Sequence, residues 1–125
     1  MSAAMGVLLV MGLLLLKHFI CDFPLQMHPY QYENKGTYGH PGGLLHSGIH
    51  IVGTLLVMGL FVPIPLALGL ALLDGLIHYH VDWVKMNINR IYNWKPDNSE
   101  FFWLSLGVDQ MLHGATYILL VFIIL

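Results

Sequence analysis

The chain has 125 residues, of which 57% are hydrophobic and only 10% are Asp, Glu, Lys or Arg. Soluble domains carry about a quarter charged residues, and disordered chains carry few apolar ones, so this composition excludes both classes and indicates an integral membrane protein. The net charge of −2 leaves too little positive charge for a nucleic-acid-binding surface, so we expect no nucleic-acid partner. The single cysteine excludes an internal disulfide.

Four segments are apolar and long enough to cross a bilayer, which takes about 20 residues for each helix. They cover about residues 3–21, 43–62, 64–84 and 101–125. We therefore predict an all-α fold, a polytopic four-helix bundle that residues 1–125 form as a single domain. We predict that the protein is embedded in a lipid bilayer. The sequence leaves open whether it forms a homo-oligomer.

The connections between these segments differ in length. A tight turn around Pro63 joins the second and third segments, whereas polar loops at residues 22–42 and 87–100 form the other two connections. Ser99 or Asn98 is suited to cap the fourth helix. All five basic residues lie in or beside the two long loops: Lys17, Lys35, Lys85, Arg90 and Lys95. The positive-inside rule therefore predicts cytoplasmic loops and both termini outside.

Ionisable residues recur at a spacing of four within every span. Residues four apart lie on the same face of a helix, so each span presents one ionisable stripe. These stripes are His18 and Asp22; His46 and His50; Asp74, His78 and Asp82; and Asp109 and His113. The positions along the four spans place the stripes in the same half of the bundle, on the side of the long loops.

Carboxylates inside a membrane are costly and need partners. Only Lys17 and Lys85 lie close to the spans, and two lysines cannot neutralise four aspartates. Divalent cations can do so, and histidine with carboxylate suits zinc, manganese or iron. All nine stripe residues are candidate ligands, more than the four to six that one ion takes, so two ions are plausible. Proton or ion conduction and polar helix packing stay open as alternatives.

Other polar residues are assigned smaller roles. Gln26 and Gln110 are candidates for hydrogen-bonding the ligands. Lys85 is suited either to hold an anionic substrate or to mark the membrane interface. We expect the three remaining histidines, His28, His40 and His80, to lie outside the site because two are in loops and His80 is mostly off the face of His78.

The motif set resembles a family of unknown function that comprises small inner-membrane proteins of bacteria and their phages. The matching residues are His18, Asp22, Phe23, Leu25, Gln26, Lys35, His46, His50, His78, Asp82, Lys85, Asp109, Gln110 and His113. This resemblance implies a location in the bacterial inner membrane. More distantly, the pattern is similar to membrane-bound metal-dependent hydrolases and to the helical zinc phospholipases C.

The leading functional prediction is a metal-dependent hydrolase with a mononuclear or dinuclear centre, acting on a phosphoester such as a lipid headgroup at the cytoplasmic interface. Bound cations lower the pKa of water and polarise a phosphoryl oxygen. Asp82 or Asp109 is the predicted general base, and Lys85 is predicted to bind negative charge. A di-iron redox or oxygenase protein and a metal or proton transporter are the alternatives.

Overall fold

The computed structural model describes all 125 residues and contains helices but no strands. The elements are α1 (Ala3–Asp22), the 3-10 turn η1 (Pro24–Gln26), α2 (Pro29–Tyr32), α3 (Pro41–Met58), α4 (Ile64–Ile91) and α5 (Glu100–Ile124). The four long helices are each long and apolar enough to cross a membrane, and they pack together. The predicted all-α four-helix architecture is therefore confirmed.

Two helix boundaries differ from the predicted spans. α3 ends at Met58 rather than near residue 62, because the chain turns at Gly59 before Pro63 precedes α4. α4 continues past residue 84 to Ile91 and stops before Asn93, which adopts a left-handed φ of 53°. Its 28 residues extend about 42 Å, which exceeds the roughly 30 Å hydrocarbon core. A hydropathy boundary marks where a helix becomes polar, not where it ends.

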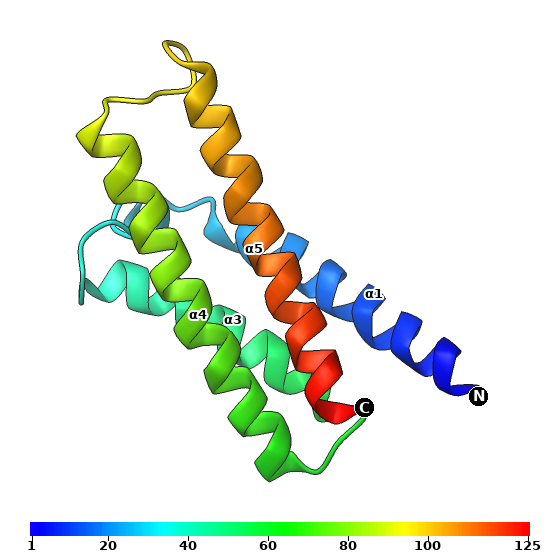
Figure 1. Cartoon of the computed structure of the whole chain (residues 1–125). Coiled ribbons are helices and arrows are strands. Elements are labelled where there is room, and N and C mark those ends of the chain that lie inside the picture. Colours follow the sequence, from blue (N-terminus) through cyan, green and yellow to red (C-terminus); the bar gives the residue numbers. More distant parts are fainter.

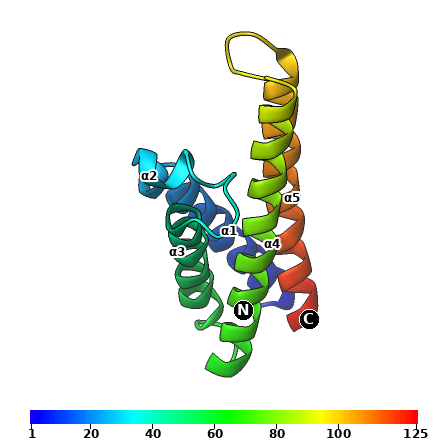
Figure 2. The same ribbon diagram turned by 90° about the vertical axis from the view of Figure 1, so that its left-hand side faces the viewer.

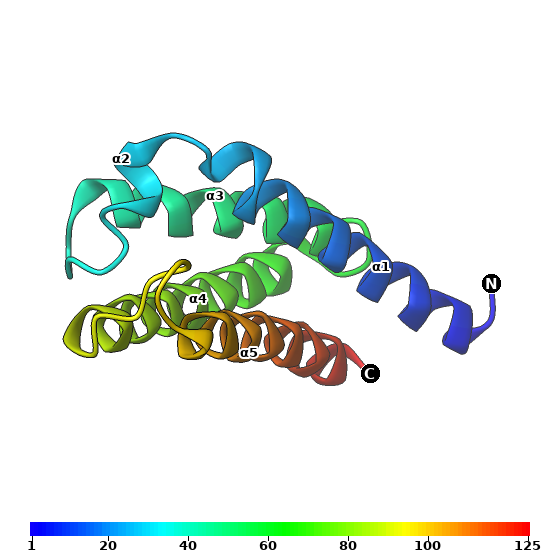
Figure 3. The same cartoon turned by 90° about the horizontal axis from the view of Figure 1, so that it is seen from above.

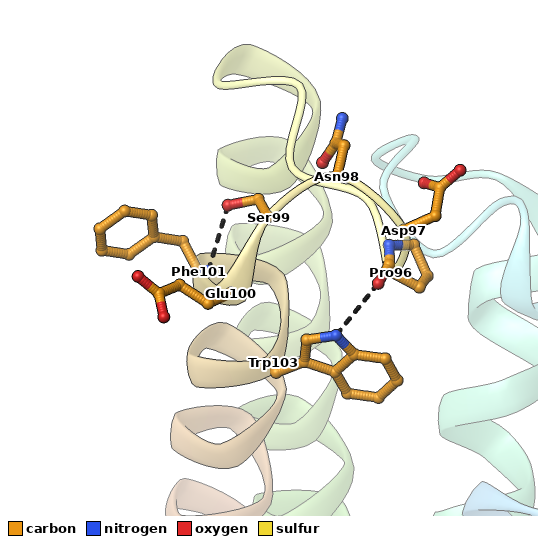
Figure 4. A pocket seen from close by; sticks show the side chains of 7 residues that line it. All are labelled: Pro96, Asp97, Asn98, Ser99, Glu100, Phe101 and Trp103. Carbon is orange, nitrogen blue, oxygen red and sulfur yellow. Dashed lines mark hydrogen bonds between the residues drawn. The ribbon is translucent and has the colours of Figure 1, made fainter.

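The long loop ends in a capped helix start. The Ser99 hydroxyl accepts a hydrogen bond from the Phe101 N–H at 3.1 Å, so Ser99 is the cap of α5 (Figure 4). The Trp103 indole donates to the Pro96 carbonyl at 3.1 Å, which ties the loop back onto the helix (Figure 4). Exposed Asp97 lies in this loop, away from the bundle interior.

The long helices form two layers, α1 with α3 and α4 with α5 (Figure 3). Both termini and the α3–α4 turn lie at one end of the bundle, and the two long connections lie at the other (Figures 1 and 2). The hairpin of α4 and α5 extends beyond the other helices at that second end (Figure 2). This packing of the four helices places their ionisable stripes next to one another.

The interior is divided into an apolar part and a polar part. The apolar cluster comprises Val10, Leu14, Met58, Ala67, Leu70, Tyr117, Leu120 and Val121. The close approach of α3 to α4 depends on Gly75, where an added Cβ atom would lie 2.2 Å from Ile51 Cγ1. This contact brings the stripe of α3 against that of α4.

Candidate metal centre

The polar part of the interior contains every predicted ligand. Of the 28 buried residues, 15 are polar or charged, and all nine predicted ligands are among them. So many buried ionisable groups are stable in a membrane protein only if they neutralise or coordinate one another. Their individual distances therefore decide what the cluster can bind.

The closest convergence joins one histidine of α3 and one of α4. The Nε2 atoms of His46 and His78 lie 3.1 Å apart. Asp22 Oδ1 lies 3.1 Å from the first and 3.4 Å from the second. Asp82 Oδ2 lies 3.4 and 3.1 Å from the same two atoms. Two carboxylate oxygens therefore share one pair of ring nitrogens.

The distances among His46 Nε2, His78 Nε2 and Asp82 Oδ2 suit a single cation, whereas no group of candidate ligand atoms within 4.8 Å of one another contains both Asp22 and Asp82. Neighbouring ligands on one tetrahedral zinc ion, with bonds of about 2.0–2.1 Å, lie about 3.3 Å apart. The outer Nδ1 atoms of His46 and His78 and the Oδ2 atom of Asp82 are buried without a hydrogen bond. A neutral imidazole has only one N–H, so two facing Nε2 atoms beside two carboxylates cannot satisfy one another fully. The donor set fits a divalent cation.

The other predicted ligands surround this convergence. His18, Asp22, His50 and His78 offer atoms within 4.8 Å of one another, as do Asp22, Asp109 and His113. His113 Nε2 lies 3.3 Å from Asp82 Oδ1 and 3.4 Å from Asp109 Oδ1. Together with His46 and Asp82, these groups contain eight of the predicted ligands.

Asp74 has a different partner. Its Oδ2 atom accepts hydrogen bonds from Lys17 Nζ, at 2.9 Å, and from the Thr54 hydroxyl. Asp74 belongs to none of the groups that bring candidate ligand atoms together. Lys17 of α1 thus pairs with Asp74 directly, and the role of Asp74 as a metal ligand stays a prediction.

Lys17 also determines which ring nitrogen of His50 carries the hydrogen. Its ammonium group lies 2.9 Å from His50 Nδ1 and 3.2 Å from the Tyr117 hydroxyl. An ammonium only donates, so His50 Nδ1 accepts and its Nε2 carries the hydrogen, which it donates to Asp22 Oδ1 at 2.7 Å. In this arrangement His50 orients Asp22.

Tyr117 extends the same network to α1. Its hydroxyl lies 2.9 Å from His18 Nδ1 and accepts from Lys17, so it donates to the His18 ring. His18 Nε2 then donates to Gln110 Oε1 at 2.7 Å and lies 3.1 Å from Asp22 Oδ2. Sequence reasoning missed Tyr117 and Thr54, although Tyr117 follows His113 by four residues and Thr54 follows His50 by four.

The two glutamines have different surroundings. Gln110 Nε2 donates to Asp109 Oδ2 at 3.0 Å and lies 3.4 Å from Asp22 Oδ2, so Gln110 links three candidate ligands through its two ends. Gln26 donates instead to the backbone carbonyl of Asp22. It supports the end of α1 and makes no side-chain contact with a candidate ligand.

Two further lysines approach the carboxylates. Lys35 Nζ lies 3.1 Å from Asp82 Oδ2, and Lys85 Nζ lies 3.3 Å from Asp109 Oδ1 and 3.9 Å from Asp82 Oδ1. The expectation that only two lysines are near the four aspartates is therefore wrong. Three lysines face three of the aspartates, and Asp22 alone has no lysine.

Lys35 reaches the cluster because the loop before α3 passes close to that helix. A Cβ atom at Gly42 would lie 1.9 Å from the Tyr30 carbonyl oxygen, and one at Gly43 would lie 3.3 Å from Lys35 Cα. The short helices η1 and α2 shape this segment, which we predicted as a polar loop. The folded loop thus brings the positive charge of Lys35 to the cluster, although Lys35 belongs to none of the ionisable stripes.

The family of this chain follows from the comparison with known families. The family described as a protein of unknown function (DUF3307) matches residues 10–125. The chain belongs to the DUF3307 family. No curated protein and no solved structure matches it. The predicted membership in a family of unknown function is confirmed, and the more distant similarity to hydrolases stays a prediction.

The three remaining histidines of this DUF3307 protein lie outside the cluster, as expected. His28 and His40 cap α2 and α3, accepting from the N–H groups of Tyr30 and Gly42. His80 contacts the Tyr38 hydroxyl and the Leu76 carbonyl at 2.9 and 2.7 Å. They serve as natural controls for the buried histidines.

Proposed function

We propose that this DUF3307 protein is a membrane-embedded, metal-dependent hydrolase of phosphoesters. The observation that carries the proposal is the convergence of His46 and His78 Nε2 with one oxygen each of Asp22 and Asp82. Nitrogen and carboxylate donors of this kind suit zinc, manganese or iron. Facing helices of a bundle are a common source of such centres.

The charges favour one ion over two. Lys17, Lys35 and Lys85 face Asp74, Asp82 and Asp109, which leaves Asp22 as the buried carboxylate without a positive partner. One divalent cation held by His46, His78 and Asp82, close to Asp22, more than offsets this remaining negative charge, and a second would leave the cluster strongly positive. His50, which hydrogen-bonds Asp22, and His18, whose Nε2 lies 3.1 Å from Asp22 Oδ2, then hold the carboxylate in position.

The residues beside the proposed centre have roles that suit hydrolysis. A divalent cation would supply a water molecule of lowered pKa and polarise a phosphoryl oxygen. The Lys85 ammonium is the group placed to bind the negative charge of the ester. The Oδ1 atom of Asp109, which lies 3.3 Å from Lys85 Nζ and 3.4 Å from His113 Nε2, is the group that we propose as general base. Asp82 then acts as a ligand.

We propose a location in the bacterial inner membrane with both long loops in the cytoplasm. The structure supports this topology in one respect, because both loops lie at the same end of the bundle (Figure 2). The basic residues Lys35, Arg90 and Lys95 belong to this end. Cysteine labelling of the α3–α4 turn and of the α4–α5 loop in intact cells tests this orientation.

Metal content and phosphate release test the proposed activity. We expect about one divalent ion per chain and release of phosphate from a phosphoester in the purified protein. His78→Ala abolishes both, whereas His40→Ala, matched in chemistry and located at the cap of α3, preserves both. Metal-free protein, or equal metal content in both variants, would refute the proposal.

The alternative functions give different signals in the same samples. Bound iron with an electron paramagnetic or optical signal, and no phosphate release, would favour a redox or oxygenase protein. Ion flux into liposomes that His78→Ala removes would favour a transporter.

A further inference from the structure

An apolar groove lies between α4 and α5 on the outside of the bundle. Its volume is about 510 Å3. Its apolar walls are formed by side chains that include Val81, Val84, Ile88, Val108 and Leu112. Val84, Ile88, Val108 and Leu112 are exposed on the bundle surface, so the groove faces the hydrocarbon of a surrounding membrane.

The groove differs from an ordinary lipid-facing furrow because two charged residues line it. Lys85 and Asp109 belong both to its wall and to the buried cluster. The Lys85 side chain is 13% exposed, compared with 1% for Asp109, and its ammonium lies 3.3 Å from Asp109 Oδ1, which leaves at least one of its three N–H groups for a ligand in the groove. It lies 3.9 Å from Asp82, a proposed metal ligand. An anionic group bound at Lys85 would therefore lie beside the proposed centre.

The polarity of the groove follows that of a lipid leaflet. Trp94 and Ser105 line its loop end, and Val81 and Leu112 line it nearer the middle of the two helices. Trp94 stacks on Tyr92 and Phe101, and aromatic groups of this kind favour the headgroup region of a membrane. A lipid bound with its headgroup toward the loops would have its polar part near Trp94 and Ser105 and its acyl chains near Val81 and Leu112.

A second groove, between α1 and α3, provides a comparison. It is larger, at about 750 Å3, and its wall includes Lys17. The Lys17 ammonium, however, is already hydrogen-bonded to Asp74, His50 and Tyr117, which uses all three of its N–H groups. Of these two grooves, the one between α4 and α5 is the one whose lysine keeps an N–H group for a ligand.

We propose that the α4–α5 groove binds a phospholipid of the surrounding membrane, with its acyl chains against the apolar wall and its phosphate at Lys85. This inference rests on the proposed function, because it identifies the phosphoester as part of a lipid. It requires that the substrate enter sideways from the bilayer.

Binding to metal-free protein in detergent tests this inference without turnover. The probes are didecanoyl phosphatidic acid, didecanoylglycerol, which lacks the phosphate, and glycerol 3-phosphate, which lacks the chains. Native mass spectrometry counts the bound molecules. We expect phosphatidic acid to bind at least about tenfold more tightly than didecanoylglycerol, and glycerol 3-phosphate to show no binding.

Filling each groove with an indole identifies the one that is used. Val108→Trp fills the α4–α5 groove, and Val52→Trp fills the α1–α3 groove as the matched control, since both valines are exposed to the membrane. We expect about a tenfold loss of phosphatidic acid affinity in the first variant and wild-type affinity in the second. Val84→Trp, from the opposite wall, repeats the test, and thermal melting verifies that each variant is folded.

Lys85→Gln tests the headgroup contact, and it should reduce phosphatidic acid affinity to that of didecanoylglycerol. Equal affinity in the Val108→Trp and Val52→Trp variants would overturn the inference, as would tight binding of glycerol 3-phosphate, which would identify a soluble substrate. If the protein binds lipid but releases no phosphate in the presence of zinc or manganese, the proposed hydrolase activity is refuted and the lipid site in the groove stays supported. If the protein hydrolyses p-nitrophenyl phosphate but binds no lipid, the proposed lipid site in the groove is refuted and the proposed hydrolase activity is not.

Discussion

Replacing Lys17 by methionine tests the most deeply buried lysine–aspartate pair of the structure. The Lys17 side chain is 4% exposed and its ammonium lies 2.9 Å from Asp74 Oδ2. Methionine has nearly the same length, so the substitution removes the charge while leaving the stem in place. Asp74 is then left as a buried carboxylate whose only remaining hydrogen bond is from Thr54.

The expected loss of stability follows from this isolated charge. Removing one partner of a buried pair destabilises a protein by about 3–5 kcal/mol, because the other charge stays buried without compensation. The lost hydrogen bonds to His50 and Tyr117 act in the same direction. We therefore expect the free energy of unfolding to fall by about 4 kcal/mol in Lys17→Met.

Unfolding in mixed detergent micelles, followed by circular dichroism, measures this change. Lys95→Met is the matched control, because Lys95 lies in the exposed α4–α5 loop and its side chain has no partner, and it should leave stability unchanged. Adding Asp74→Asn to Lys17→Met should recover part of the loss, since it removes the isolated charge. A loss below about 1 kcal/mol, or a double variant as unstable as the sum of the single ones, would refute the ion-pair reasoning.

Three further predictions concern loop packing and the metal centre. Gly42→Ala should strongly destabilise the protein, because its Cβ atom would collide with the Tyr30 carbonyl, whereas Gly48→Ala, with open space around it, should not change the melting temperature. Removing divalent metal with a chelator should lower the melting temperature, since a ligand that binds only the folded state stabilises it, and identical melting curves would contradict a resident cation. His46→Ala and Asp22→Asn should each remove the metal, and the double variant should lose no more, because ligands of one centre act together; additive partial losses in metal titrations would indicate separate sites.

The positions of the candidate ligands could be predicted because helix geometry is local. Residues four apart share a face whatever the tertiary structure, and equal depth follows from counting residues along each span. The meeting of His46 with His78 was therefore predictable in outline. The partner of Asp74 was not, because Lys17 and Asp74 lie on different helices whose relative rotation depends on packing at positions such as Gly53.

Loop conformation was the second feature of the site that the sequence could not predict. Lys35 lies in a polar segment that the sequence describes only as a connection, yet α2 and the close passage at Gly43 direct it into the cluster. The charge count that called for divalent cations therefore omitted a lysine whose position no periodic pattern encodes. The prediction of two ions rested on the number of candidate ligands, whereas the proposal of one ion rests on the charge of the third lysine.

The charge count leads to a prediction about Lys35 itself. Its ammonium lies 3.1 Å from Asp82 Oδ2, the same oxygen that faces His46 and His78, so it competes with a cation for this ligand. Lys35→Gln removes the competing charge and leaves Asp82 fully negative. We expect the affinity for zinc, measured by competition with a fluorescent chelator, to rise by about tenfold or more, since the repulsion between two cations at this separation in a protein interior exceeds about 1.4 kcal/mol. Arg90→Gln removes an exposed positive charge of the same sign at the end of α4 and should leave the affinity unchanged. A weaker or unchanged affinity in Lys35→Gln would show that the cation does not bind at Asp82 Oδ2.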